Sequence, residues 1–268
     1  MSHFAFCVLG SGSSGNCSLL KINESKWIMI DAGFSMRQTK ERMRTHNICM
    51  DEVGDVLLTH LDRDHFNPAW CRTLLNRGIF VHLHERHVDR GIRAGLDPKI
   101  MRPFTTSIDF EHLHVETVHM AHDVLGTVGF IFNYAQCQTR FGFATDLGRV
   151  PQSLLDTFTS LDMLAFESNY DPTMQRASGR PDFLQDRIMG GGGHLSNEES
   201  LAAVKHIAEN SNLQHIVLLH LSRQCNASAI IRDLYQDHLA HLYDCVTITD
   251  QDRCSRLLRL EKQPTSLF

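Results

Sequence analysis

Thr59-His60-Leu61-Asp62-Arg63-Asp64-His65 is the segment of this sequence with the densest set of possible metal ligands. Its first residue ends the largely apolar run Asp55–Thr59, which is typical of a short buried strand. Its two histidines and two aspartates lie within six residues, and a short loop at a strand end can turn them toward one point. Imidazole and carboxylate together suit Zn, Mn or Fe. Taken alone, the segment also fits a solvated polar loop, because Asp and His are common in loops.

Three more residues of this type each follow a predicted strand: His122, Asp146 and His220. Open α/β architectures place their sites at strand ends, and three such coincidences are not expected by accident. Histidine is also frequent, at 17 of 268 residues. We therefore expect these residues and the quoted segment to form one metal centre.

Composition excludes several classes of protein. The 268 residues contain no run of 18 apolar residues, so no transmembrane helix and no membrane partner are expected. Residues 1–10 lack the basic start and long apolar core of a signal peptide. The net charge of −5 gives no overall basic surface for nucleic acid and leaves only a local basic patch open. The eight cysteines include no C-x-x-C pair, so free thiols in a cytoplasmic protein are expected.

Apolar runs and amphipathic segments follow one another in an order that predicts an α/β fold. Strands are expected at Phe4–Leu9, Cys17–Ile22, Lys26–Asp31, Asp55–Thr59, Ile79–Leu83, Leu113–His119, Val128–Tyr134, Arg140–Thr145, Leu161–Glu167, Ile216–Leu219 and Cys245–Thr249. Helices are expected at Ser35–Thr45, Pro68–Asn76, Glu85–Ala94, Pro151–Phe158, Asn197–Glu209 and Ala227–Leu239. No linker separates two halves, so residues 1–268 are expected to form one domain, with helices outside two sheets.

Gly10-Ser11-Gly12-Ser13-Ser14-Gly15 matches the dinucleotide-binding pattern G-x-G-x-x-G. That pattern requires a helix to begin at the last glycine, whereas the following residues alternate as in a strand. The segment therefore predicts a strand–loop–strand hairpin.

In this set of residues the chain resembles the metallo-β-lactamase superfamily, whose central motif is H-x-H-x-D-H. It is most similar to the YycJ (WalJ)-type branch, through blocks that occur in family order between residues 9 and 222. The blocks are Leu9-Gly10-Ser11-Gly12-Ser13-Ser14-Gly15-Asn16, Ile30-Asp31-Ala32-Gly33, His122-Asp123, Ala144-Thr145-Asp146, Glu167-Ser168-Asn169-Tyr170-Asp171, Gly193-His194-Leu195-Ser196-Asn197 and His220-Leu221-Ser222. The resemblance implies an αββα four-layer sandwich, two metal ions between the sheets, and DNA exonuclease-type hydrolysis of phosphodiesters.

The resemblance also implies a role for each residue of the site. His60, Asp62 and His122 would hold the first ion; Asp64, His65 and His220 would hold the second; and Asp146 would bridge both. Asp31 would orient ligands without binding metal. His194 would contact the leaving oxygen or the phosphate, and with Asp64 it is expected to serve catalysis. A hydroxide between the two ions would be the nucleophile.

Asp62 departs from the family motif, which usually has His at this position. Two dications carry +4, and the usual two carboxylates and one hydroxide leave +1, whereas a third carboxylate brings the sum to zero. That change favours Mn or Fe over Zn and weakens attraction for a phosphodiester. A second interpretation is that Asp62 points away and pairs with Arg63 or another cation, which would leave a weak first site.

Three functions remain open from the sequence. The first is a dinuclear phosphodiesterase acting on DNA or nucleotides. The second is a hydrolase of a small neutral ester, lactone or amide, which a neutral metal core favours. The third is a metal-bound redox or binding protein without hydrolytic turnover. Arg and Lys converging on the pocket would favour the first, and an apolar cleft would favour the second.

Overall fold

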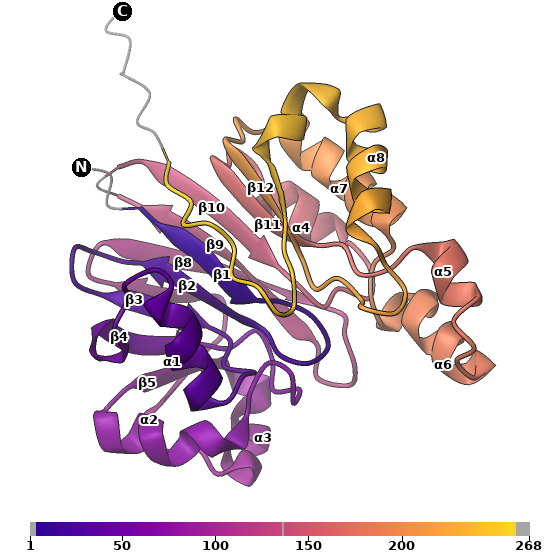
Figure 1. The fold of residues 1–268 in the computed structure, drawn as a ribbon. Helices are drawn as coiled ribbons and strands as arrows, with labels where there is room; N and C mark the ends of the chain where they lie inside the picture. Colours follow the sequence, from indigo (N-terminus) through magenta and orange to yellow (C-terminus); the bar gives the residue numbers. More distant parts are fainter. Residues whose placement is uncertain (1–3, 136, 261–268) are drawn as a thin grey trace, which may run out of the picture.

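Two mixed β-sheets packed face to face form the centre of the computed structural model (Figure 1). The structure describes residues 4–135 and 137–260. Within these residues, no helix has the length and apolar character needed to cross a membrane.

The first sheet has the order β1-β2-β3-β4-β5-β6, and its neighbours pair antiparallel from β1 to β3 and parallel from β3 to β6. Its strands are β1 (Phe6–Gly10), β2 (Cys17–Lys21), β3 (Trp27–Ile30), β4 (Val53–Leu57), β5 (Phe80–His84) and β6 (Met101–Phe104). Its outer face carries the helices α1 (Met36–Arg44), α2 (Cys71–Arg77) and α3 (Val88–Ala94) (Figure 1).

The second sheet has the order β13-β12-β11-β10-β9-β8-β7, with antiparallel pairs from β7 to β10 and parallel pairs from β10 to β13. Its strands are β7 (Ser107–Phe110), β8 (Leu113–Met120), β9 (Thr127–Tyr134), β10 (Thr139–Ala144), β11 (Met163–Glu167), β12 (His215–Leu219) and β13 (Val246–Ile248). The helices α4 (Gln152–Thr157), α7 (Asn197–Glu209) and α8 (Ser228–His238) cover it.

Three apolar cores correspond to the three interfaces between four layers. One lies between the first sheet and its helices, and another lies between the second sheet and its helices. The third lies between the two sheets and includes Phe6, Leu20, Phe130 and Phe141, all fully buried. Burial on both faces explains why central strands such as β3 and β11 are continuously apolar over most of their length. The predicted αββα sandwich is confirmed.

Most predicted elements form within a few residues of their expected ends. The glycine-rich segment joins β1 to β2 as an antiparallel hairpin, as predicted. Ser196 caps α7, where its Oγ accepts the Glu199 N–H at 3.1 Å and its own N–H donates to Glu199 Oε2 at 2.8 Å. This capping box fixes the chain directly after His194.

Two strands and two α-helices of the described residues were not predicted from the sequence. Strands β6 and β7 are four residues long, and their polar positions disguise the pattern. The segment between β11 and α7 adds the short helices α5 (Pro172–Arg176) and α6 (Asp182–Arg187), followed by a π-type turn at Ile188–Gly192.

Candidate metal centre

The candidate centre lies where strands of both sheets end. Asp31, Asp146 and His220 follow β3, β10 and β12, and their φ angles are +59°, +55° and +57°. Residues other than glycine adopt this left-handed backbone region at a cost on the order of 1–3 kcal/mol, and residues in this conformation cluster at functional sites. The sharp turn re-aims each side chain from the sheet toward the gap between the two sheets.

The first predicted ligand group comes together. One ligand atom from each of His60, Asp62 and His122 lies within 4.8 Å of the others. Asp62 Oδ2 is 3.8 Å from His60 Nε2 and 3.8 Å from His122 Nε2. The first two residues come from the loop after β4, and the third comes from the loop after β8, so both sheets contribute.

The second predicted group is equally close. Asp64, His65 and His220 also have ligand atoms within 4.8 Å of one another, and His220 Nε2 is 3.3 Å from Asp64 Oδ2. Asp146 lies between the two groups. One of its oxygens is within 4.8 Å of ligand atoms of His60, from the first group, and of His65, from the second. Its two oxygens lie 2.9 Å from His65 Nε2 and 3.6 Å from His220 Nε2.

Buried polar groups hold the ligands from behind. Asp31 is buried and accepts the Nδ1–H of His65 at 2.7 Å, and it also accepts the Thr59 backbone N–H at 2.9 Å. His122 donates its Nδ1–H to the Gly193 carbonyl at 3.0 Å. Such bonds fix the ring orientation and leave Nε2 free for a metal. Asp31 thus lies where the sequence analysis expected an orienting acid.

At His122 and Asp146 the neighbouring charges and hydrogen bonds together outweigh burial. Burial opposes protonation of His122, but the hydrogen bond with Asp62 and the charges of Asp146 and Glu167 outweigh it and raise its pKa to about 9. For Asp146, burial is outweighed by His220 and His65, which hold the pKa of that carboxyl well below its usual range. These shifts favour charged pairs of imidazole and carboxylate, the same groups that would bind metal ions.

The donor set fits divalent metal ions. Burial and the neighbouring His65 lower the pKa of His60, so this imidazole is neutral, as a ligand must be. His60 Nε2 is buried and has no hydrogen-bond partner among the described residues. An unpaired buried nitrogen is costly unless something binds it. It is aimed at the group formed with Asp62 and His122, where an ion would complete it.

Asp62 combines features of both interpretations that the sequence left open. Its Oδ1 accepts a hydrogen bond from Arg90 at 2.5 Å, so it does pair with a cation, although not with Arg63. Its Oδ2 nevertheless faces the two histidines of the first group. The aspartate therefore reaches the position that the ligand assignment requires.

His194 lies beside the predicted ligands and is held by a residue to which the sequence analysis gave no role. Its Nδ1–H donates to Glu167 Oε1 at 2.7 Å, and Nδ1 is 3.5 Å from Asp146 Oδ1. Glu167 is fully buried, and its other oxygen accepts the Leu147 N–H at 2.6 Å. Glu167 ends β11 just as the predicted ligands follow their strands, so the same strand-end signal could have identified it.

A hollow of about 350 Å³ opens over the ligands. His194 lines it together with Asp62, Asp64 and Asp146, and Arg180 and Arg187 line it from the segment before the π-type turn. A neighbouring hollow shares Ser13 and Asp64 with it and adds Arg63. The centre therefore lies under positive side chains despite the net charge of −5.

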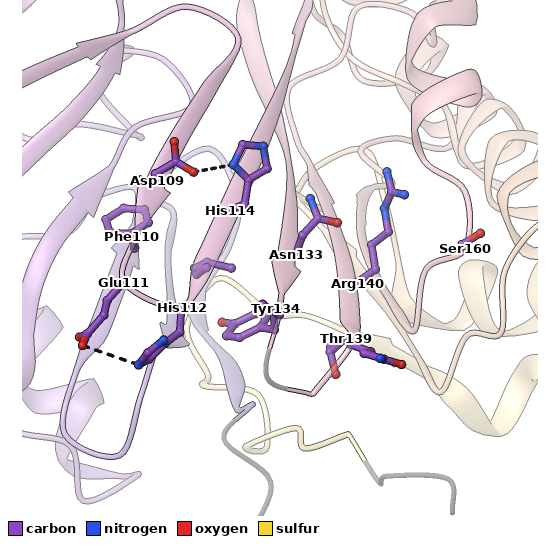
Figure 2. Close-up of a pocket in the computed structure, with 13 residues that line it drawn as sticks. Asp109, Phe110, Glu111, His112, His114, Asn133, Tyr134, Thr139, Arg140 and Ser160 are labelled. Atoms are coloured by element: carbon purple, nitrogen blue, oxygen red, sulfur yellow. Dashed lines mark hydrogen bonds and ion pairs between the residues drawn. The ribbon is translucent and has the colours of Figure 1, made fainter. Parts of the chain in front are cut away.

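Another hollow lies at the far end of the second sheet and contains none of the predicted ligands (Figure 2). Two ion pairs line it, namely His114 Nδ1 with Asp109 Oδ1 at 2.6 Å and His112 Nε2 with Glu111 Oε1 at 3.7 Å. It is located at the start of β8, and the eight residues of that strand place it roughly 25 Å from the loop with His122.

Comparisons with known proteins identify the family. A family model described as "Beta-lactamase superfamily domain" matches residues 26–221. The chain is similar to exodeoxyribonuclease YycJ of Bacillus anthracis, with 26% identity over 233 residues that cover 85% of this chain and 86% of the relative.

Solved structures show the same fold. The metallo-beta-lactamase fold protein YhfI from Bacillus subtilis matches with a TM-score of 0.69 and 12% identity, over 95% of this chain and 99% of that chain. The short form of human tRNase Z matches with a TM-score of 0.63 and 16% identity, over 94% and 98%. The chain therefore belongs to the metallo-β-lactamase superfamily.

Proposed function

We propose that this metal-dependent hydrolase cleaves phosphodiester bonds of DNA from an end, with two divalent ions held by the two ligand groups and bridged by Asp146. The observation that carries the proposal is the pair Arg180 and Arg187 at the rim of the hollow over the ligands. Guanidinium groups match phosphate oxygens in charge and geometry. The relative YycJ is named an exodeoxyribonuclease, which supports the same substrate.

The ions, when bound, would activate a water molecule as nucleophile and neutralise the phosphate charge. His60, Asp62 and His122 are assigned to the first ion, and Asp64, His65 and His220 to the second. Zn, Mn and Fe all suit imidazole with carboxylate, and the third carboxylate favours Mn or Fe.

His194 has the position of a group that meets the leaving oxygen. Its side chain is about one-fifth exposed and lines the hollow, while Glu167 fixes the ring through Nδ1. An imidazole oriented in this way leaves Nε2 free to face the substrate, where it can donate a proton to the leaving oxygen. The chain after His194 is fixed by the capped α7, whereas a Cβ added at Gly190 or Gly192 would meet no atom within 4 Å.

The two arginines differ in how firmly they are held. Arg180 is half-buried and donates to Gln224 Oε1 at 3.2 Å and Gln175 Oε1 at 3.3 Å. Arg187 is exposed and forms no ion pair with any residue that the structure describes. Arg187 is therefore free to follow a phosphate, and Arg180 offers a fixed contact.

A substrate panel tests the proposal. Linear duplex DNA labelled at either end, a covalently closed circular DNA, bis-p-nitrophenyl phosphate, p-nitrophenyl acetate and a lactone are each incubated with protein loaded with Mn, Zn or Fe. We expect loss of label from linear DNA and no cleavage of the closed circle. Turnover of only the acetate or lactone would support the hydrolase of neutral substrates, which the third carboxylate at Asp62 favours. Metal binding without any turnover would contradict hydrolysis.

Arg187→Gln separates a phosphate contact from general damage. We expect the KM for DNA to rise by roughly tenfold, the effect of losing one charged hydrogen bond, with little change for p-nitrophenyl acetate. Arg176→Gln is the matched control, because Arg176 is exposed on the neighbouring helix α5 and does not line the hollow. Equal KM values in the two variants would refute the assignment.

A further inference from the structure

Arg90 lies beside the candidate centre, and nothing in the motifs pointed to it. It is on α3, in the layer outside the first sheet, and its side chain is about one-third exposed. Its guanidinium spans two carboxylates, with one nitrogen 2.5 Å from Asp62 Oδ1 and another 3.1 Å from Asp123 Oδ2. The two acids lie in loops that follow strands of different sheets, Asp62 after β4 and Asp123 after β8.

This contact determines which oxygen of Asp62 faces the centre. Oδ1 is taken by Arg90, and Oδ2 points to the Nε2 atoms of His60 and His122. A free aspartate could rotate or bind an ion through both oxygens. The guanidinium therefore restricts Asp62 to a single oxygen toward the first group.

Asp123 anchors the arginine from the other side. Its Oδ1 accepts the backbone N–H groups of Leu125 at 2.8 Å and Gly126 at 3.0 Å, so its charge is dispersed into its own loop. His87, also near the start of α3, lies with Nε2 3.1 Å from the Gly126 carbonyl. The loop that carries His122 is thus held against α3 at two points.

Charge gives the arginine its second role. With three carboxylates and one hydroxide, two dications leave a centre of zero net charge, which attracts an anionic phosphodiester poorly. Arg90 places a permanent positive charge on the third carboxylate, because arginine does not lose its proton in proteins.

We propose that Arg90 is a positioning residue that orients Asp62 toward the first ion and offsets its charge, so that a centre with three carboxylates still binds an anionic phosphate. This inference rests on the proposed function, but it concerns anion binding and not cleavage.

A charge ladder tests the inference by calorimetry, with inorganic phosphate titrated into Mn-loaded protein. Relative to wild type, Arg90→Gln removes one positive charge, Asp62→His adds one, and the double variant cancels the two changes. We expect phosphate affinity to fall roughly three- to tenfold in Arg90→Gln, to rise by a similar factor in Asp62→His, and to return within about twofold of wild type in the double variant. The contribution of Asp123 is the same in all four proteins.

Two further variants separate position from charge. Arg93→Gln removes a positive charge from the same helix without touching Asp62, so its phosphate affinity should stay within about twofold of wild type. Arg90→Lys keeps the charge but loses the two-nitrogen span, so phosphate affinity should be retained. The visible spectrum of its Co-loaded form should change, because the first ion loses its fixed oxygen, whereas the spectrum of Arg93→Gln should match wild type.

The outcomes distinguish this inference from the proposed function. Phosphate affinity in Arg90→Gln equal to wild type, with both ions bound, would overturn the inference even if the protein degrades DNA. If the four proteins show the expected order of phosphate affinities but the wild type does not cleave DNA, the inference stands and the proposed nuclease activity is refuted. A protein that binds no divalent ions would overturn both.

Discussion

Asp146→Asn should remove most of the bound metal, because this carboxylate is the group proposed to be shared by both ligand sets. Asn has nearly the same shape, so the substitution changes charge and donor strength with little change in packing. One ligand oxygen of Asp146 lies within 4.8 Å of ligand atoms of His60 from the first group and His65 from the second. Within the second group, its oxygens lie 2.9 Å from His65 Nε2 and 3.6 Å from His220 Nε2. Each ion would lose one anionic ligand.

The size of the effect follows from burial. Asp146 is 2% exposed, and removing one partner from a buried charged contact costs about 3–5 kcal/mol. At about 1.4 kcal/mol per tenfold, this corresponds to a loss of roughly two to four orders of magnitude in metal affinity. Without metal, His65 and His220 would each lose one carboxylate partner whose charge raises the pKa of the imidazole, so the free energy of unfolding should fall as well.

Metal content after dialysis, measured by elemental analysis, and a competitive titration against a chelating dye give the result. The control is Asp162→Asn, which changes a half-buried aspartate that accepts the Arg140 N–H at 2.8 Å, far from the ligands. Wild type and the control should hold two ions per chain. If Asp146→Asn holds the same two ions with unchanged affinity, the bridging assignment is wrong.

Three other outcomes are expected. His194→Ala should keep both ions and lose about 10²- to 10⁴-fold in turnover, the range for a positioned acid, as measured by steady-state kinetics and metal analysis; full activity would make His194 merely a loop residue. Glu167→Gln should lower kcat with unchanged metal content, since the ring of His194 loses its carboxylate partner at 2.7 Å. Burial lowers the pKa of His87 to about 4, against about 6.5 in the unfolded chain, and its Nδ1 is buried without a partner among the described residues. The unfolded chain alone gains this proton between pH 6.5 and 4, so the free energy of unfolding should fall by about 1–2 kcal/mol from pH 7.5 to pH 5. Urea unfolding of His87→Gln should show a correspondingly smaller loss, and an identical pH dependence would contradict the assignment.

The sequence predicted that the candidate ligands gather in one centre because their signal is local, whereas their division into two groups came from the family resemblance. A residue that follows an apolar strand is placed at a sheet edge, so His122, Asp146 and His220 could be expected near His60 without any model of the loops. The αββα order could be predicted for the same reason, since long apolar strands and capped helices such as α7 have clear patterns.

The residues that were missed depend on contacts that no spacing reveals. Arg86, Arg90 and Arg93 are alike in the sequence, and only the packing of α3 brings the second of them to Asp62. Strand β6 contains Pro103 and is exposed at two of its four positions, so it lacks a strand pattern. Glu167 is different: it follows the strand-end rule but was considered only as part of a motif block.

The origin of the ligands from both sheets connects metal binding with the packing of the sandwich. His60, Asp62, Asp64 and His65 follow β4 of the first sheet, whereas His122, Asp146 and His220 follow strands of the second. Each ion would therefore cross-link the two sheets at the edge where the apolar core between them ends. In the metal-free arrangement, proton-bearing pairs make the same crossings, as between His65 and Asp146 at 2.9 Å and between His220 and Asp64 at 3.3 Å. Because these pairs already hold the ligand atoms together, an ion would replace protons without a large rearrangement, and its binding energy would contribute to joining the two sheets.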